Sequence, residues 1–208
     1  MPRSTIMQKS QTPKYNGEIV AGSLLTMESR KIARLLLDNA NPDAWHQAIV
    51  IDNILQKRSP ATAKRQARLI KNRLSLMEPE LWDLIVRGSS DVTVQALLAA
   101  AIKHSPLLGD FMDTVIRQHW RTFIKKLDDK DWKAFMETCI QVDPGIELWT
   151  VSTIAKLRQV VFRILAESKY IDSTKHLQLL PVSVIPEIRQ YLLKNSEHHI
   201  LHCMEVTL

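Results

Sequence analysis

The residues most suited to chemistry in this sequence are cations that gather in one short run. The run from Gln56 to Leu74 reads QKRSPATAKRQARLIKNRL, and no acidic residue occurs between Asp52 and Glu78. Its basic residues are Lys57, Arg58, Lys64, Arg65, Arg68, Lys71 and Arg73. Because clustered Lys and Arg release counterions from a polyanion, the run indicates a surface for nucleic acid or another strongly acidic partner.

The basic run predicts an amphipathic helix from about Ser59 to about Met77. Ser59 can accept a hydrogen bond from a free N–H of the first turn, and Pro60 suits the first helical position. Apolar residues repeat at the spacing of a buried stripe, at Ala63, Ala67, Ile70, Leu74 and Met77. The solvent side then carries Lys64, Arg65, Arg68 and Lys71, with Lys57 and Arg58 in the preceding turn and Arg73 nearest the apolar side.

A solvated helix face is the common alternative for such a charged stripe. A solvated face usually includes Glu, which supports Lys one turn away, whereas like charges at helical spacing repel by ~0.2–0.5 kcal/mol per pair. The absence of acids from the run therefore favours the surface for a polyanion.

Two further basic sets follow along the chain. Arg117, Arg121 and Lys125 are spaced to share one face of a long helix that begins after Pro106, although nearby aspartates could neutralise them. Lys156 and Arg158 lie in the first turns of a helix expected from about Thr150 to Ser168. A basic helix start followed by a hairpin-like segment is typical of a DNA-recognition helix, and an ordinary capped helix is the alternative.

No catalytic or metal site is predicted. The tail holds metal-capable side chains at His198, His199, His202 and Cys203, but an expected strand there would point them to opposite faces. The chain has no glycine-rich phosphate loop and no Gly-x-Ser-x-Gly motif, and its five tryptophans occupy apolar positions expected to anchor the core. We therefore expect a protein that is not an enzyme and has no cofactor and no small-molecule substrate.

Composition is that of an ordinary globular protein, and the net positive charge is compatible with an anionic partner. The 208 residues are 45% hydrophobic and carry a formal net charge of +6. No segment reads as a signal peptide or a membrane-spanning helix. Cys139 and Cys203 lie far apart and are expected to be reduced thiols, which favours a cytoplasmic location.

Periodicity predicts a mainly α fold in three parts. Residues 1–20 are polar and are expected to form a disordered or extended arm, and residues 21–147 read as a helical domain. Residues 148–208 read as helix, strand, helix and strand, with the strands at 177–182 and 200–206. This order predicts a small winged-helix-like unit with a short two-stranded sheet.

Several spaced segments resemble the BrxA family of BREX bacteriophage-defence systems. They read DNILQKRSPATAKR from Asp52, RL at Arg73, KHSPLLGDF from Lys103 and STIAKL from Ser152. The resemblance covers most of the chain, roughly from Ser23 to the end. It implies a bacterial cytoplasmic protein with a helical core similar to that of the RNA-binding antitermination factor NusB.

The resemblance also implies binding to double-stranded DNA. The expected neighbours are other BREX components, including a methyltransferase, a phosphatase-like protein and a large ATPase, and no catalytic motif is implied. A protein–protein adaptor and an RNA-binding protein remain the alternatives. The expected DNA-contacting residues come from the charge pattern alone.

Overall fold

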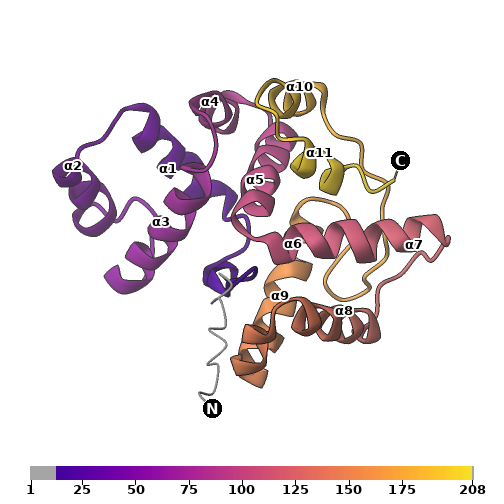
Figure 1. The fold of residues 1–208 in the computed structure, drawn as a ribbon. Helices are drawn as coiled ribbons and strands as arrows, with labels where there is room; N and C mark the ends of the chain where they lie inside the picture. Colours follow the sequence, from indigo (N-terminus) through magenta and orange to yellow (C-terminus); the bar gives the residue numbers. More distant parts are fainter. Residues whose placement is uncertain (1–12, 208) are drawn as a thin grey trace, which may run out of the picture.

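The computed structural model describes residues 13–207, which are helices joined by loops (Figure 1). The α-helices are α1 (Thr26–Leu37), α2 (Pro42–His46), α3 (Pro60–Leu74), α4 (Pro79–Arg87), α5 (Ser90–His104), α6 (Pro106–Asp110), α7 (Arg117–Arg121), α8 (Asp129–Val142), α9 (Val151–Glu167), α10 (Pro186–Lys194) and α11 (His198–Met204). Two 3-10 helices, η1 (Glu18–Ala21) and η4 (Pro144–Leu148), and two π-helices, η2 (Gln47–Ile51) and η3 (Phe111–Ile116), complete the set. Within residues 13–207 no helix is long and apolar enough to cross a membrane.

Local capping residues begin several of these helices. The Asn41 side chain accepts a hydrogen bond from the Ala44 N–H at 2.8 Å ahead of α2, and the Ser59 hydroxyl accepts one from the Thr62 N–H at 3.3 Å ahead of α3. Asp128 forms a reciprocal capping box with Asp131 at the start of α8. Each cap satisfies a backbone N–H that the helix itself leaves free. The predicted start of α3 at Ser59 and Pro60 is therefore confirmed.

Helix α5 lies at the centre of the molecule. Ten of its fifteen residues are buried, including the small residues Ala99, Ala100 and Ala101, which let neighbouring helices approach closely. Its neighbours are α1, α3, α4, α6, α10 and α11. In Figure 1, α1 to α3 extend to one side of α5 and α6 and α7 to the other, with α8 and α9 below.

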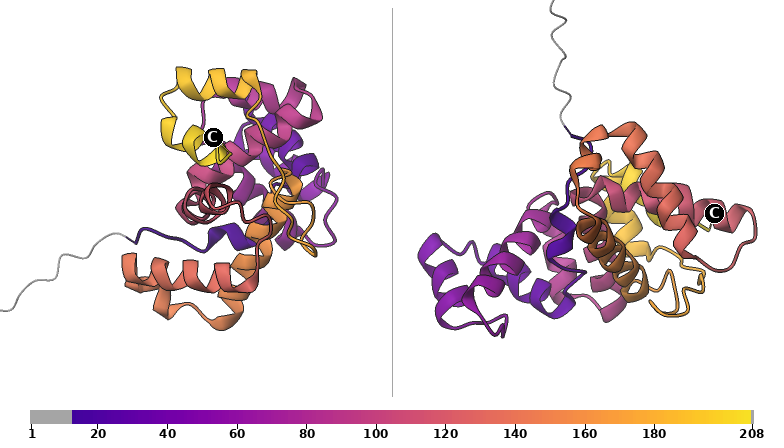
Figure 2. Two further views of the ribbon diagram at one scale, coloured as in Figure 1. Left: turned by 90° about the vertical axis from the view of Figure 1, so that its right-hand side faces the viewer. Right: turned by 90° about the horizontal axis from the view of Figure 1, so that it is seen from below.

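A cluster of aromatic rings joins η3, α8 and α9. Phe111 lies 5.1 Å from Phe135, 5.5 Å from Trp132 and 5.8 Å from Phe162, measured between ring centroids. The edge-to-face and tilted geometries are those that aromatic pairs prefer. This cluster packs α8 and α9 against the rest of the core. Figure 2 shows the course of these helices from two further sides.

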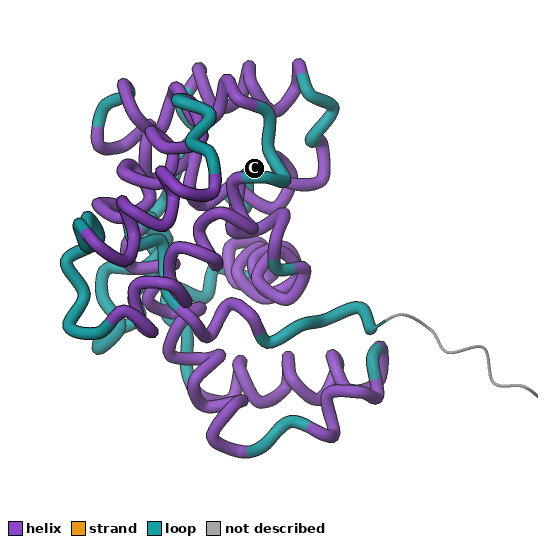
Figure 3. The backbone as a smooth tube through the Cα atoms, turned by 90° about the vertical axis from the view of Figure 1, so that its left-hand side faces the viewer, coloured by secondary structure: helices purple, strands orange, loops and turns teal. Residues whose placement is uncertain are grey.

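The predicted two-stranded sheet is wrong. Residues 13–207 contain helices and loops but no strand (Figure 3), and only isolated bridges join Lys126 to Gln178 and Ile171 to Leu179. The segment expected as the second strand is helix α11. Its apolar residues follow helical spacing and are buried, at Ile200, Leu201, Cys203 and Met204. Since the segment after α9 holds only isolated bridges and the predicted second strand is a helix, residues 13–207 do not contain the two-stranded sheet of the predicted winged-helix-like unit.

The start of the described chain is packed into the fold. Tyr15 is buried, and its backbone N–H donates to Asp143 Oδ2 at 3.0 Å. Ile19 in η1 is fully buried, and η1 contacts both α3 and α9. Residues 1–12, most of the predicted N-terminal arm, lie outside the described residues. The division into a helical domain and a C-terminal region stays a prediction.

Candidate nucleic-acid interface

Helix α3 forms with the two sides that its sequence predicts. Ala63, Ala67, Ile70 and Leu74 are at most 1% exposed. Its exposed cations are Lys64, Arg65, Arg68 and Lys71, and none of them forms an ion pair within residues 13–207. The predicted cationic side of α3 is thus present and is not neutralised by the described acids.

The fifth cation of this helix has a different role. Arg73 is 4% exposed and donates hydrogen bonds to the carbonyl oxygens of Ser23 at 2.5 Å and Gly22 at 2.9 Å. Burial lowers the pKa of Arg73 to about 10, and the Glu167 carboxylate opposes this shift, so the guanidinium stays charged at neutral pH. Arg73 therefore fastens the η1–α1 connection to α3, and its predicted place near the apolar side is confirmed.

Glu167 fastens the same connection to α9. Its carboxylate accepts hydrogen bonds from the Ser23 hydroxyl at 2.8 Å and from the Leu24 N–H at 2.9 Å. Residues 22–24 are thus held by a cation of α3 on one side and an acid of α9 on the other. This pair of contacts fixes the spacing between the two helices.

A small pocket lies between α3, η1 and α9, and we call it the seam pocket. It has a volume of about 230 Å³. Its lining residues are Val20, Ala21, Gly22, Ser23, Leu25, Arg65, Gln66, Lys156, Gln159, Val160 and Arg163. Three of them are cations and none is an acid, although they come from segments about ninety residues apart in the sequence.

Polar atoms in the seam pocket are suited to an oxyanion. Lys156 Nζ donates to Gln159 Oε1 at 2.7 Å and keeps two further N–H donors. Arg65 and Arg163 are exposed and form no ion pair within the described chain. Arg and Lys donate to phosphate oxygens through short, charge-assisted hydrogen bonds. The arrangement can therefore bind a phosphate group between two helices.

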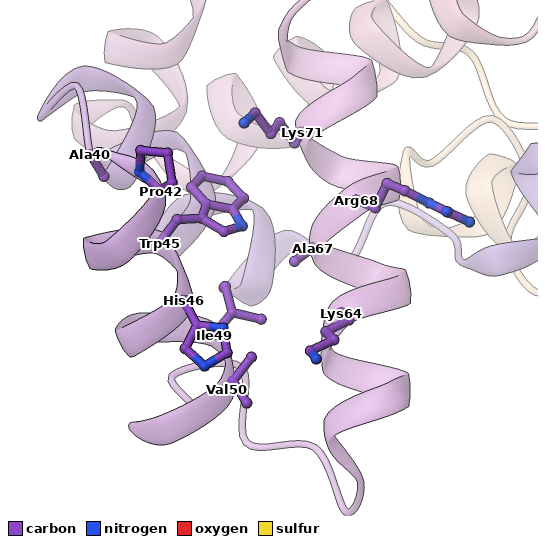
Figure 4. A pocket seen from close by; sticks show the side chains of 10 residues that line it. All are labelled: Ala40, Pro42, Trp45, His46, Ile49, Val50, Lys64, Ala67, Arg68 and Lys71. Carbon is purple, nitrogen blue, oxygen red and sulfur yellow. The ribbon is translucent and has the colours of Figure 1, made fainter.

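A larger pocket lies on the opposite side of α3, toward α2, and we call it the Trp45 pocket. It has a volume of about 520 Å³. Its lining residues are Ala40, Pro42, Trp45, His46, Ile49, Val50, Lys64, Ala67, Arg68 and Lys71. Figure 4 shows Lys64 and Lys71 reaching toward α2, while Arg68 extends away from Trp45. Trp45 is half-buried, in contrast with Trp132, which is fully in the core as predicted.

The turn before α3 is partly neutralised. Lys57 forms an ion pair with Glu28 of α1, and both side chains are only about one-fifth exposed. Arg58 is exposed. The sequence run itself contains no acid, so this pairing depends on the tertiary fold.

The second predicted basic set does not share one helix face. Arg117 is 5% exposed, with its guanidinium bonded to Asp113 Oδ1 at 2.8 Å and to the Glu205 carbonyl at 3.0 Å. The helix ends at Arg121, so Lys125 lies in the loop beyond it. Arg121 and Lys125 are both exposed. They lie at the end of α7 that is away from α3 (Figure 1).

The third predicted set divides in the same way. Lys156 lines the seam pocket, whereas Arg158 is paired with Asp129 and lies over the Phe162 ring, 4.4 Å from its centroid. Arg163 lines the seam pocket but was not among the predicted residues. It follows Lys156 by seven residues, two helical turns, which is the signal in the sequence that places both on one face.

Tyr15 and the two cysteines are held in their protonated forms. The Tyr15 hydroxyl donates to Asp110 Oδ2 at 2.6 Å, and burial, reinforced by this carboxylate, raises the pKa of Tyr15 above its usual range. Burial raises the pKa of Cys139 to about 11 and that of Cys203 to about 12. Across residues 13–207, no group of three or more His, Cys, Asp or Glu side chains is placed to hold a metal ion.

Comparisons with known proteins agree on one family. The family model described as BrxA matches residues 13–196. The chain belongs to the BrxA family. A protein named BREX protein BrxA from Paramagnetospirillum magneticum is 45% identical over 94% of this chain and 98% of its own length. One of the same name from Escherichia coli O9:H4 is 34% identical over 91% of this chain and 89% of its own.

A solved structure also matches this BrxA-family chain. It is a crystal structure of an uncharacterized protein from Magnetospirillum magneticum, 44% identical, with a TM-score of 0.87. The match covers 93% of this chain and all of the other. The resemblance to the BrxA family inferred from the sequence is thus confirmed, while the expected likeness to NusB stays a prediction.

Proposed function

We propose that this BrxA-family protein is a non-catalytic, double-stranded DNA-binding subunit of a BREX phage-defence system and acts in the bacterial cytoplasm. The observation that carries the proposal is the seam pocket, where cations of α3 and α9 meet with no acid in the lining. Two helices that present cations to one small hollow can hold a backbone phosphate from both sides. Contacts of this kind fix the position of a protein on DNA without reading its sequence.

Arg68 extends this contact along α3. It is exposed and, unlike Lys64 and Lys71, it points away from Trp45 (Figure 4). A duplex presents one phosphate charge for about every 1.7 Å of its length, so cations on adjacent turns of α3 can meet neighbouring phosphates. The binding therefore depends on charge and should weaken as salt increases.

A salt titration tests the proposal. Each lost phosphate contact lowers the slope of log affinity against log salt by about 0.9. The Arg65→Ala/Lys156→Ala/Arg163→Ala variant should bind duplex DNA more weakly, with a slope reduced by roughly two to three. The matched control removes the same formal charge from exposed residues outside both pockets, in Lys130→Ala/Lys133→Ala/Lys175→Ala. If both variants lose the same affinity and slope, net charge governs binding and the seam pocket has no special part.

The set at the end of α7 is a separate arm of the same experiment. Arg121→Ala/Lys125→Ala removes two exposed cations from the end of the molecule away from α3. If this variant loses binding while the seam-pocket variant keeps it, the DNA surface lies on the α7 side and the proposed site is wrong.

A second candidate function is docking of another BREX subunit, and exposed apolar residues at the start of α9 favour it. Leu148 is 87% exposed and Val151 is 85% exposed. Co-purification with the candidate methyltransferase, phosphatase-like and ATPase subunits, with and without nuclease, separates docking from tethering through DNA. Partners that still co-purify after nuclease treatment, but no longer do so with the Leu148→Ser/Val151→Ser variant, support docking. Competition between duplex DNA and structured RNA for the protein tests the RNA-binding alternative.

A further inference from the structure

The Trp45 pocket has two walls of opposite chemistry. One wall comes from α2 and η2 and is apolar and aromatic, with Pro42, Trp45, Ile49 and Val50. The other comes from α3 and carries cations. A volume of about 520 Å³ falls within the range of pockets that bind small organic ligands.

No carboxylate lines this pocket. Asp52, the acid at the end of η2, accepts a hydrogen bond from the Gln47 side chain at 2.8 Å. Lys64 and Lys71 are exposed and reach toward α2 (Figure 4), and Lys71 Nζ lies 4.6 Å from the Trp45 ring centroid. Since His46 also lines the pocket, an anion there would meet donors from both walls.

The apolar wall has an unusual backbone. Residues 47–51 form the π-helix η2, which continues directly from α2. Single π turns are rare and occur frequently at functional sites. Trp45 with Ile49, and His46 with Val50, are pairs four residues apart that all line the pocket, so the α2–η2 segment presents one continuous face to it.

We propose that the Trp45 pocket binds a nucleotide, either free or at the end of a nucleic-acid strand. The base lies against Trp45 and the apolar wall, and Lys64 and Lys71 bind the phosphate. An inorganic phosphate would leave the apolar wall uncovered, and an apolar ligand would leave Lys64 without a partner. Stacking of a base on an aromatic ring tolerates any base, so the pocket selects the class of ligand rather than one base.

The proposal is independent of duplex binding through the seam pocket. Arg65, Lys156 and Arg163 do not line the Trp45 pocket, and neither Trp45 nor Lys71 lines the seam pocket. Variants of one site can therefore be tested for binding at the other.

Calorimetric titration with AMP, ATP and inorganic phosphate provides the test. Both nucleotides should bind, and phosphate should bind much more weakly than either. Trp45→Ala should weaken nucleotide binding by about tenfold or more through lost stacking, and Lys64→Ala/Lys71→Ala should do so by a similar factor through lost charge-assisted hydrogen bonds. Because both lysines are exposed, the second variant tests the pocket even if Trp45→Ala fails to fold.

Two controls decide the outcome. Arg65→Ala/Lys156→Ala should bind nucleotide as the unchanged protein does while losing affinity for duplex DNA. Competition of bound AMP with an open-ended duplex and with a closed dumbbell of the same sequence separates the sources, since only the duplex has a terminal nucleotide. Displacement by the open-ended duplex alone assigns the pocket to strand ends, and displacement by neither assigns it to free nucleotide. Three results would overturn the proposal. They are displacement of AMP by both DNAs, no nucleotide binding at millimolar concentration, and binding of nucleotide by the Lys64→Ala/Lys71→Ala variant as tightly as by the unchanged protein.

Discussion

Replacement of Arg73 by methionine should destabilise the protein markedly. The guanidinium donates hydrogen bonds to the Ser23 and Gly22 carbonyls at 2.5 and 2.9 Å, and hydrogen bonds to charged groups contribute about 1.5–3 kcal/mol each. Methionine recovers part of this loss because it fills similar space and carries no charge to desolvate. We expect a net loss of about 3 kcal/mol in the free energy of unfolding. This is the lower end of the range of about 3–5 kcal/mol for removing one member of a buried ion pair.

Urea unfolding followed by circular dichroism measures this loss. For a protein of this size about 3 kcal/mol corresponds to a fall in Tm of about 6–12 °C. The matched control is Lys64→Met on the same helix, where the side chain is exposed and unpaired within the described chain, so the change should stay within about 0.5 kcal/mol. Equal midpoints for Arg73→Met and Lys64→Met would refute the assignment of Arg73 as the fastening between α3 and the η1–α1 connection.

Three further predictions follow from the backbone and the buried titratable groups. Phe123 is 87% exposed with a φ of 58°, so Phe123→Asn should raise the free energy of unfolding by about 1 kcal/mol, and no gain would mean that this backbone is unstrained. Burial lowers the pKa of His104 although Glu18 opposes it, so the unfolded chain takes up the proton first as pH falls below about 6.5. Stability should therefore fall from pH 7 to 5.5, with a smaller fall in His104→Gln if the assignment is right. Because burial raises the pKa of Cys139 to about 11 and of Cys203 to about 12, a disulfide reagent at pH 8 should label them only after unfolding, and fast labelling of the native protein would contradict this.

The parts of the fold that were predicted correctly depend on neighbouring residues. The start of α3 follows from Ser59 and Pro60, and its buried side follows from the spacing of Ala63, Ala67 and Ile70. Caps and helical periodicity act within one or two turns, so a single sequence contains them. The same local spacing was present in residues 200–204, where a strand was predicted although the apolar residues fit a helix.

The composition of the candidate site could not be predicted, because tertiary contacts decide which cations remain available. Glu28 pairs with Lys57 across twenty-nine residues, and Asp129 pairs with Arg158 across the same separation. Arg117 donates a hydrogen bond to the Glu205 carbonyl, far along the sequence, so its guanidinium is not available to an external anion. The seam pocket depends equally on the meeting of α3 with α9, which no local pattern encodes.

The distribution of acids separates structural cations from cations suited to an external anion. Arg73 and Arg117 are buried and bonded within the fold, so their charges are already compensated. Arg65, Lys156 and Arg163 meet at one hollow whose lining holds no acid, and none of them forms an ion pair within residues 13–207, so their mutual repulsion is at most partly relieved by the fold. A bound phosphate would relieve it, and the folded protein should therefore gain stability on adding phosphate-rich ligands at low salt. Removing the three charges should instead stabilise the free protein while abolishing that gain. If the triple alanine variant is no more stable than the unchanged protein and gains as much from added DNA, then repulsion at the seam does not drive binding.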